Sequence, residues 1–158
     1  MKKEGFTLIE VLIVIAIFTV ISGIALFINF KDISGYSFRS ERDILITSLY
    51  KARNQAINNI CLGPDCVNGK PHGIALHPLA PENKYIIFQG SNFANRDATI
   101  DEIISLGYAI NIAGDTEIIF SNLSGDATPA QSSITISDKA GHSSVITINS
   151  EGQITWTN

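Results

Sequence analysis

The residues that could carry acid–base or nucleophilic chemistry are few and lie far apart in this chain. Its three histidines, His72, His77 and His142, stand without the sequence signature of a nucleophile. The adjacent pair Asp101-Glu102 is more typical of a solvated turn than of an acid–base pair. We therefore predict that the chain is not an enzyme and that it uses no cofactor.

The two cysteines, Cys61 and Cys66, are a second group with possible chemistry. They flank Gly63-Pro64, and in an oxidising compartment such a spacing can close a small disulfide loop. Two free thiols are an alternative. A zinc site with His72 and His77 is another, because the ligand types are suitable, but the spacing fits no common zinc module. We favour the disulfide and predict no metal site.

Glu10 stands out because of its surroundings. It is the only charged residue between Phe6 and Phe30, and as a helix this run of residues would extend about 37 Å. A hydrocarbon core is about 30 Å thick, so the run is long enough to span a membrane. A secretory signal peptide has a shorter apolar core and a small-x-small cleavage site. A plain anchor does not explain a carboxylate, which is costly in lipid.

The elements that position these residues begin with two helical segments. Residues 6–30 are expected to form a transmembrane helix, and residues 31–60 an amphipathic continuation, with a kink or break at Gly35. Apolar residues at helical spacing define one stripe of the second segment: Leu45, Leu49, Ala52, Ala56 and Ile60. This stripe should pack on the rest of the chain.

Residues 61–158 change to short β-prone runs between turn residues and are expected to form a globular head. About seven strands are predicted, with a hairpin turn at Ser150-Glu151-Gly152. Their positions are residues 73–77, 85–89, 103–112, 117–120, 133–137, 144–149 and 153–156. The predicted fold class is α+β, in which a long N-terminal helix packs its second half on an antiparallel sheet.

The first residues resemble a known processing signal. Lys2, Lys3 and Gly5, followed by Phe6-Thr7-Leu8-Ile9-Glu10 and a membrane-length apolar run, are similar to the class III signal of type IV pilins and type II secretion pseudopilins. The resemblance implies that residues 1–5 are a leader. A prepilin peptidase would cut between Gly5 and Phe6 and methylate the new amine of Phe6. It also implies that Glu10 pairs with that amine on a neighbouring subunit during assembly.

A location and partners are also predicted. Lys2 and Lys3 should keep the short N-terminus in the cytoplasm, so the helix would sit in inner-membrane lipid with the head outside. The protein would later join other pilin or pseudopilin subunits through its N-terminal helix. The resulting filament would be a type IV pilus or a type II secretion pseudopilus.

Two head segments resemble the GspH/FimT type of minor pilin. Leu49 to Ile57 reads L-x-x-A-R-x-x-A-I and leads to Gly73-Ile74-Ala75-Leu76, while Ile146 to Ile154 is similar to that family's last hairpin. An Ala-Arg pair also arises from simple core packing beside a solvated charge. The predicted function is a structural minor pilin or pseudopilin.

A pilus-tip module for DNA uptake or surface adhesion is the alternative function. In the DNA-uptake members of the resembled family, arginines surround the glycine of the final hairpin, whereas residues 150–156 here contain no basic residue. The formal net charge is −4, and Lys139 is the only positive side chain after Arg96. Phosphate contacts supply most non-specific affinity for nucleic acid. We therefore expect no tight DNA binding.

Overall fold

A computed structural model describes residues 7–26, 30–64, 66–77, 84–107 and 110–157. The chain divides into two units, residues 1–34 and residues 35–158, and each is described here by itself. The fold is α+β, with an N-terminal helix and antiparallel sheets, as the sequence predicts.

Helix α1 spans Leu8–Leu26. It begins where the carbonyl oxygen of Thr7 accepts hydrogen bonds from the amides of Glu10 and Val11, at 3.1 and 3.3 Å. Proline is absent from the run, so nothing breaks the hydrogen-bond ladder. Among the described residues, no helix has both the length and the hydropathy that crossing a membrane requires.

Helix α2 spans Phe30–Ile57, and its buried stripe was predicted correctly in part. Leu45, Leu49, Ala52 and Ala56 are fully buried. Ile60 is not on the stripe, because the helix ends at Ile57, Asn59 takes the left-handed conformation at φ 53°, and the Ile60 side chain is 37 % exposed. The predicted break at Gly35 is wrong, since the helix continues through it.

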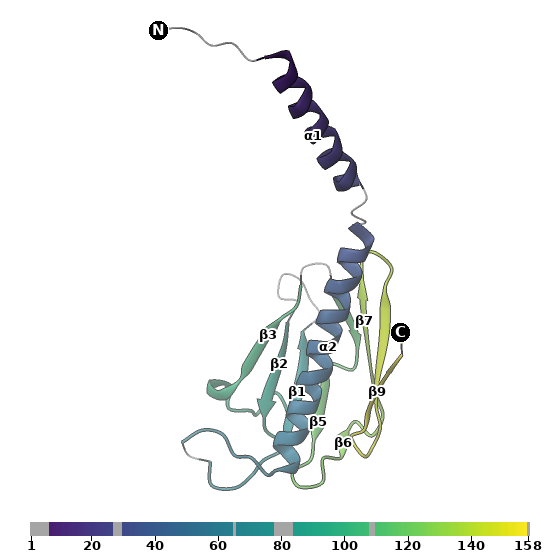
Figure 1. Cartoon of the computed structure of the whole chain (residues 1–158). Helices are drawn as coiled ribbons and strands as arrows, with labels where there is room; N and C mark the ends of the chain where they lie inside the picture. The colour runs from purple at the N-terminus through teal and green to yellow at the C-terminus, as the bar shows by residue number, and fades with distance from the viewer. Residues whose placement is uncertain (1–6, 27–29, 65, 78–83, 108–109, 158) are drawn as a thin grey trace. The chain divides into compact units, whose positions relative to one another are not determined.

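Two sheets form the rest of the head within the described ranges (Figure 1). Neighbouring strands in both are antiparallel. The five-stranded sheet has the order β3-β2-β1-β5-β6, with β3 Glu102–Ser105, β2 Lys84–Gln89, β1 His72–His77, β5 Glu117–Phe120 and β6 Ala127–Thr128. The four-stranded sheet has the order β4-β7-β8-β9, with β4 Ile110–Gly114, β7 Ser132–Asp138, β8 Ser143–Ile148 and β9 Ile154–Thr157. A short 3-10 helix, η1, spans Ala98–Ile100.

The predicted single sheet and the predicted strand over residues 103–112 are both wrong. That strand is divided between β3 and β4, which belong to different sheets. The chain leaves β3 at Leu106, which is buried, and at Gly107, whose amide donates to Glu41 Oε1 on α2 at 3.2 Å. The predicted hairpin turn at residues 150–152 is confirmed, with Gly152 at φ 71°.

One apolar core lies between α2 and the inner faces of both sheets (Figure 1). The alternation along each strand directs every second side chain inward. The strand residues in this core are Ile74, Leu76, Tyr85, Ile87, Ile110, Ile112, Ile118, Phe120, Ala127, Ile134, Ile136, Ile146, Ile148 and Ile154. The head therefore has a hydrophobic core of its own.

The outer face of the five-stranded sheet is covered by residues 91–101, which we call the strap. Phe93 of the strap packs edge-on against buried Phe88, with 5.5 Å between the ring centroids. Arg96 lies 3.5 Å above the Phe93 ring and pairs with Asp101 at 2.7 Å. The Phe93 amide also donates to Glu117 Oε1 at 2.6 Å. The strap explains why β2 is buried on both faces.

Candidate functional site

The processing and assembly residues predicted from the sequence lie at the N-terminus. Gly5 and Phe6 fall outside the described residues. Glu10 is in the first turn of α1 and is exposed. A carboxylate in the first turn is stabilised by the helix dipole. Within the described part of the chain its side chain makes no hydrogen bond or ion pair.

The apolar side chains on both sides of Glu10 along α1 are also exposed. Within residues 8–21 of α1 the large hydrophobic side chains are between 47 and 79 % exposed. They face all directions around the helix, whereas a surface helix normally has one apolar stripe. Exposed apolar surface of this extent marks an interaction site. The helix therefore presents one ionisable group on an apolar surface that needs a covering partner.

A second group of predicted residues meets at the C-terminal end of α2. Arg53 donates from Nη2 to the carbonyl oxygen of Glu151 at 3.1 Å, and its Nε is buried without a hydrogen-bond partner. A Cβ on Gly152 would lie 2.1 Å from the carbonyl oxygen of Gly125 and 2.7 Å from Arg53 Nε. The Ala-Arg pair of α2 and the glycine of the last hairpin, predicted separately, are thus in contact.

The Arg53 contact differs from a solvated charge beside a packed alanine. Ala52 is fully buried, so the helix approaches the sheets closely at this point. Arg53 is half-buried and holds the backbone of the final turn. Gly125 takes φ 74° and is buried against Ile57, and sequence analysis did not single it out. A glycine between two strand-forming runs was the available signal.

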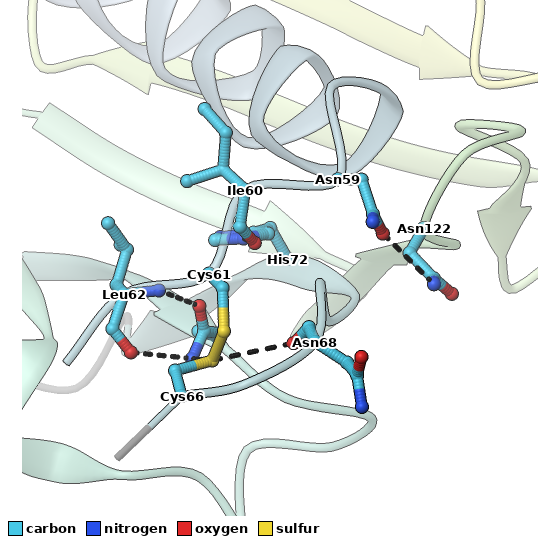
Figure 2. The surroundings of a disulfide bond; sticks show 9 residues. Asn59, Ile60, Cys61, Leu62, Cys66, Asn68, His72 and Asn122 are labelled. Atoms are coloured by element: carbon cyan, nitrogen blue, oxygen red, sulfur yellow. Dashed lines mark hydrogen bonds between the residues drawn. A yellow bond between two sulfur atoms is a disulfide. The ribbon is translucent and has the colours of Figure 1, made fainter. Parts of the chain in front are cut away.

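The loop after α2 is closed by a disulfide between Cys61 and Cys66, with 5.6 Å between the Cα atoms (Figure 2). The Gln89 carboxamide holds the loop as well, accepting from the Leu62 amide at 2.6 Å and donating to the Leu62 carbonyl at 3.2 Å. Gln89 is almost fully buried, and sequence analysis missed it. Its polar side chain at the end of the apolar run of β2 was the signal.

His72 lies beside this loop but is turned toward the backbone (Figure 2). Its Nε2 is 3.0 Å from the carbonyl oxygen of Ile60. Burial lowers the pKa of His72, and the hydrogen bond to Ile60 opposes that effect. His72 therefore stays neutral at neutral pH. Among the described residues, no three side chains of metal-ligating type come together.

The remaining candidates serve the head itself. His142 Nδ1 lies 2.7 Å from Asp138 Oδ2 and its ring stacks on Phe38 of α2. Burial opposes ionisation of Asp138, but hydrogen bonds from His142 outweigh it and lower the pKa of that carboxyl. Asp101, predicted in a solvated turn, has a side chain only 6 % exposed because it pairs with Arg96.

His77 and Glu102 also occupy structural positions. His77 is the last residue of β1. Glu102 begins β3 and pairs with Lys51 of α2, so it does not form an acid–base pair with Asp101. That the chain is not an enzyme stays a prediction.

A family model described as the prokaryotic N-terminal methylation motif matches residues 1–26. The match indicates a type IV pilin-like protein that a prepilin peptidase processes and that assembles with other pilins. No curated protein and no solved structure gave a significant match to the chain.

Proposed function

We propose that this chain is a structural minor pilin or pseudopilin of the GspH/FimT type. It is made as a prepilin with a leader of residues 1–5, inserted in the inner membrane through residues 6–30, and cut between Gly5 and Phe6. The subunit then enters a type IV pilus or a type II secretion pseudopilus. The observation that carries the proposal is the methylation-motif match at residues 1–26.

The surface of α1 supports the assembly step. Apolar side chains on all sides of a helix are covered by lipid before assembly and by neighbouring helices after it. Glu10 is costly inside such a bundle unless a positive group reaches it. Cleavage after Gly5 creates that group, the amine of Phe6 on the next subunit. The pair disfavours misregistered packing, because in any other register both charges stay buried and unpaired.

The contact between α2 and the final hairpin supports the subtype. Arg53 holds the Glu151 carbonyl, and Gly125 and Gly152 allow the close approach. These are the segments whose sequences resemble the GspH/FimT head. A membrane anchor and a separately folded head are the two parts that such a subunit requires, and residues 35–158 form a unit with its own core.

Analysis of the native N-terminus tests the proposal. The chain is expressed in cells that contain a prepilin peptidase and in matched cells that lack it, and the membrane fraction is analysed by mass spectrometry. We expect a mature chain that begins with N-methylated Phe6 in the first strain and an intact Met1 precursor in the second. A mature chain that begins elsewhere, or processing without the peptidase, would refute the assignment.

A further inference from the structure

A groove of about 510 Å³ lies between α2 and β3 in the head and has no role in the proposed function. Ile44 of α2 and Ile104 of β3 contribute aliphatic side chains to its lining. Thr47 and Asp43 add polar side chains, and Lys51 and Glu102, which form an ion pair, also line the groove. Ile44 is 44 % exposed, so the aliphatic surface is open to a ligand.

The strand beside the groove has one edge without a strand neighbour among the described residues. β3 is the terminal strand of the five-stranded sheet, and β2 is its only strand neighbour within the described residues (Figure 1). The outer edge of a terminal strand leaves backbone N–H and C=O groups unpaired, which makes it a template for another strand. Ile103, on the face of β3 opposite the groove, is 58 % exposed. The edge and the groove together suit an extended peptide.

The charges around the groove favour a basic ligand. The Asp43 side chain is 61 % exposed, whereas the Glu102 side chain, at 48 %, is paired with Lys51, which is 45 % exposed. The cation that pairs with Asp43, Arg42, is only 12 % exposed, so the carboxylate is the accessible member of that pair. Below the groove, the Tyr85 hydroxyl lies 3.0 Å from Ser48 Oγ. Burial raises the pKa of Tyr85, the hydrogen bond with Ser48 opposes that effect, and Glu41 and Glu102 add smaller contributions that raise it.

We propose that this groove docks an extended basic segment of a second polypeptide. The segment adds to β3 as a strand, as in other β-augmentation complexes, where main-chain hydrogen bonds give affinity and side-chain pockets give specificity. Alternate side chains of the segment point into the groove, where an aliphatic one contacts Ile44 and Ile104. A lysine or arginine of the segment lies beside Asp43. This inference does not depend on the pilin assignment.

Two capped peptides of about ten residues serve as probes, one of alternating valine and lysine and one of alternating valine and glutamate. Binding to the full-length chain in a neutral detergent is measured by fluorescence anisotropy. We expect the valine–lysine peptide to bind and the valine–glutamate peptide to bind at least tenfold more weakly. Asp43→Lys should weaken binding of the valine–lysine peptide about tenfold, and Asp43→Asn should have a smaller effect. The matched control is Asp126→Lys, an exposed position outside the groove lining.

Several results would overturn the proposal. Absence of binding by the valine–lysine peptide, equal binding of both peptides, or equal loss with Asp126→Lys would each exclude a basic ligand in this groove. Hydrogen exchange at Ile103–Ser105 provides a second measurement, because strand addition protects amides of β3. Unchanged exchange in the bound state would exclude strand addition. Self-association without peptide that Asp43→Lys abolishes would assign the groove to a second copy instead.

Discussion

The two helices of this chain place their apolar residues in opposite ways. The large apolar side chains of α1 over residues 8–21 are about half-exposed or more on every side, whereas those of the α2 stripe are fully buried against the sheets. The partners of α2 are encoded in the same chain. Within the described residues, the apolar side chains of α1 stay exposed. The difference indicates that α2 contributes to the fold of the head and α1 to an interaction, although both helices use the same few apolar residue types.

Substitution of Gly5 by leucine should prevent the subunit from assembling through α1. A branched side chain at the scissile bond obstructs the peptidase, so we expect complete loss of processing and no subunit in sheared filaments. Immunoblotting and mass spectrometry of the membrane fraction measure both. Gly23→Leu, at a site with open space around it, is the matched control and should be processed normally.

Truncation of matched leucines tests the contrast directly. Leu49→Ala removes a fully buried side chain from the core of the head and should lower the free energy of unfolding by about 2–5 kcal/mol. Leu12→Ala removes a side chain that is 55 % exposed on α1, and it should leave the unfolding of the head unchanged. Denaturant titration of the full chain in detergent provides the comparison. Equal losses from the two variants would contradict separate roles for the helices.

Replacement of Glu10 should affect assembly without affecting the head. Glu10→Ala removes the only charge of α1, and we expect processing to continue while the amount in filaments falls by about tenfold or more, corresponding to at least about 1.4 kcal/mol. Quantitative blotting of sheared filaments against total membrane gives the ratio. Glu10→Asp, which keeps the charge, should retain part of the assembly. Wild-type incorporation of Glu10→Ala would show that the carboxylate has no assembly role.

A change in pH should have a smaller effect, which is limited to the free energy of unfolding of the head. Burial lowers the pKa of His72 below its unfolded value, near 6.5, so the unfolded state binds more protons as the pH falls. The free energy of unfolding should therefore decrease as the pH falls below about 6.5, until the folded pKa is passed. Denaturant titrations at several pH values measure this slope. His72→Gln should remove it, and an unchanged slope would assign the effect to another group.

The sequence predicted those features that depend on local periodicity. The stripe of Leu45, Leu49, Ala52 and Ala56 follows from helical spacing, and the turn at Gly152 follows from turn chemistry. The division of residues 103–112 between two sheets was not predictable in this way. It depends on Gly107 bonding to Glu41, a contact between residues 66 positions apart in the sequence. The end of α2 at Ile57 likewise depends on the left-handed conformation of Asn59.

Site residues that belong to a sequence motif could be predicted, whereas those whose roles depend on tertiary contacts could not. Gly5, Phe6 and Glu10 were singled out through the resemblance of the first residues to a prepilin signal, and their individual roles stay predictions. Gln89 and Gly125 were missed because their roles depend on what lies next to them in the fold. The Gln89 carboxamide bridges to Leu62 across 27 positions, and Gly125 packs on Ile57 of α2. Single-sequence patterns report neighbours along a helix or strand, and they carry little information on such pairs.

The last hairpin is held on the head mainly through its main chain, so the side chains of its loop can vary. Arg53 donates to the main-chain carbonyl of Glu151, and Gly152 shapes the turn at positive φ, so the side chains of Ser150 and Glu151 are not part of the attachment. The Gln153 side chain is part of it, because its Oε1 accepts from Asn149 Nδ2 at 3.1 Å. Positions 150 and 151 can therefore change in charge and size while the loop keeps its place. The charge and size of the exposed side chains at the hairpin tip can therefore diverge without changes in the residues that hold the hairpin on the head.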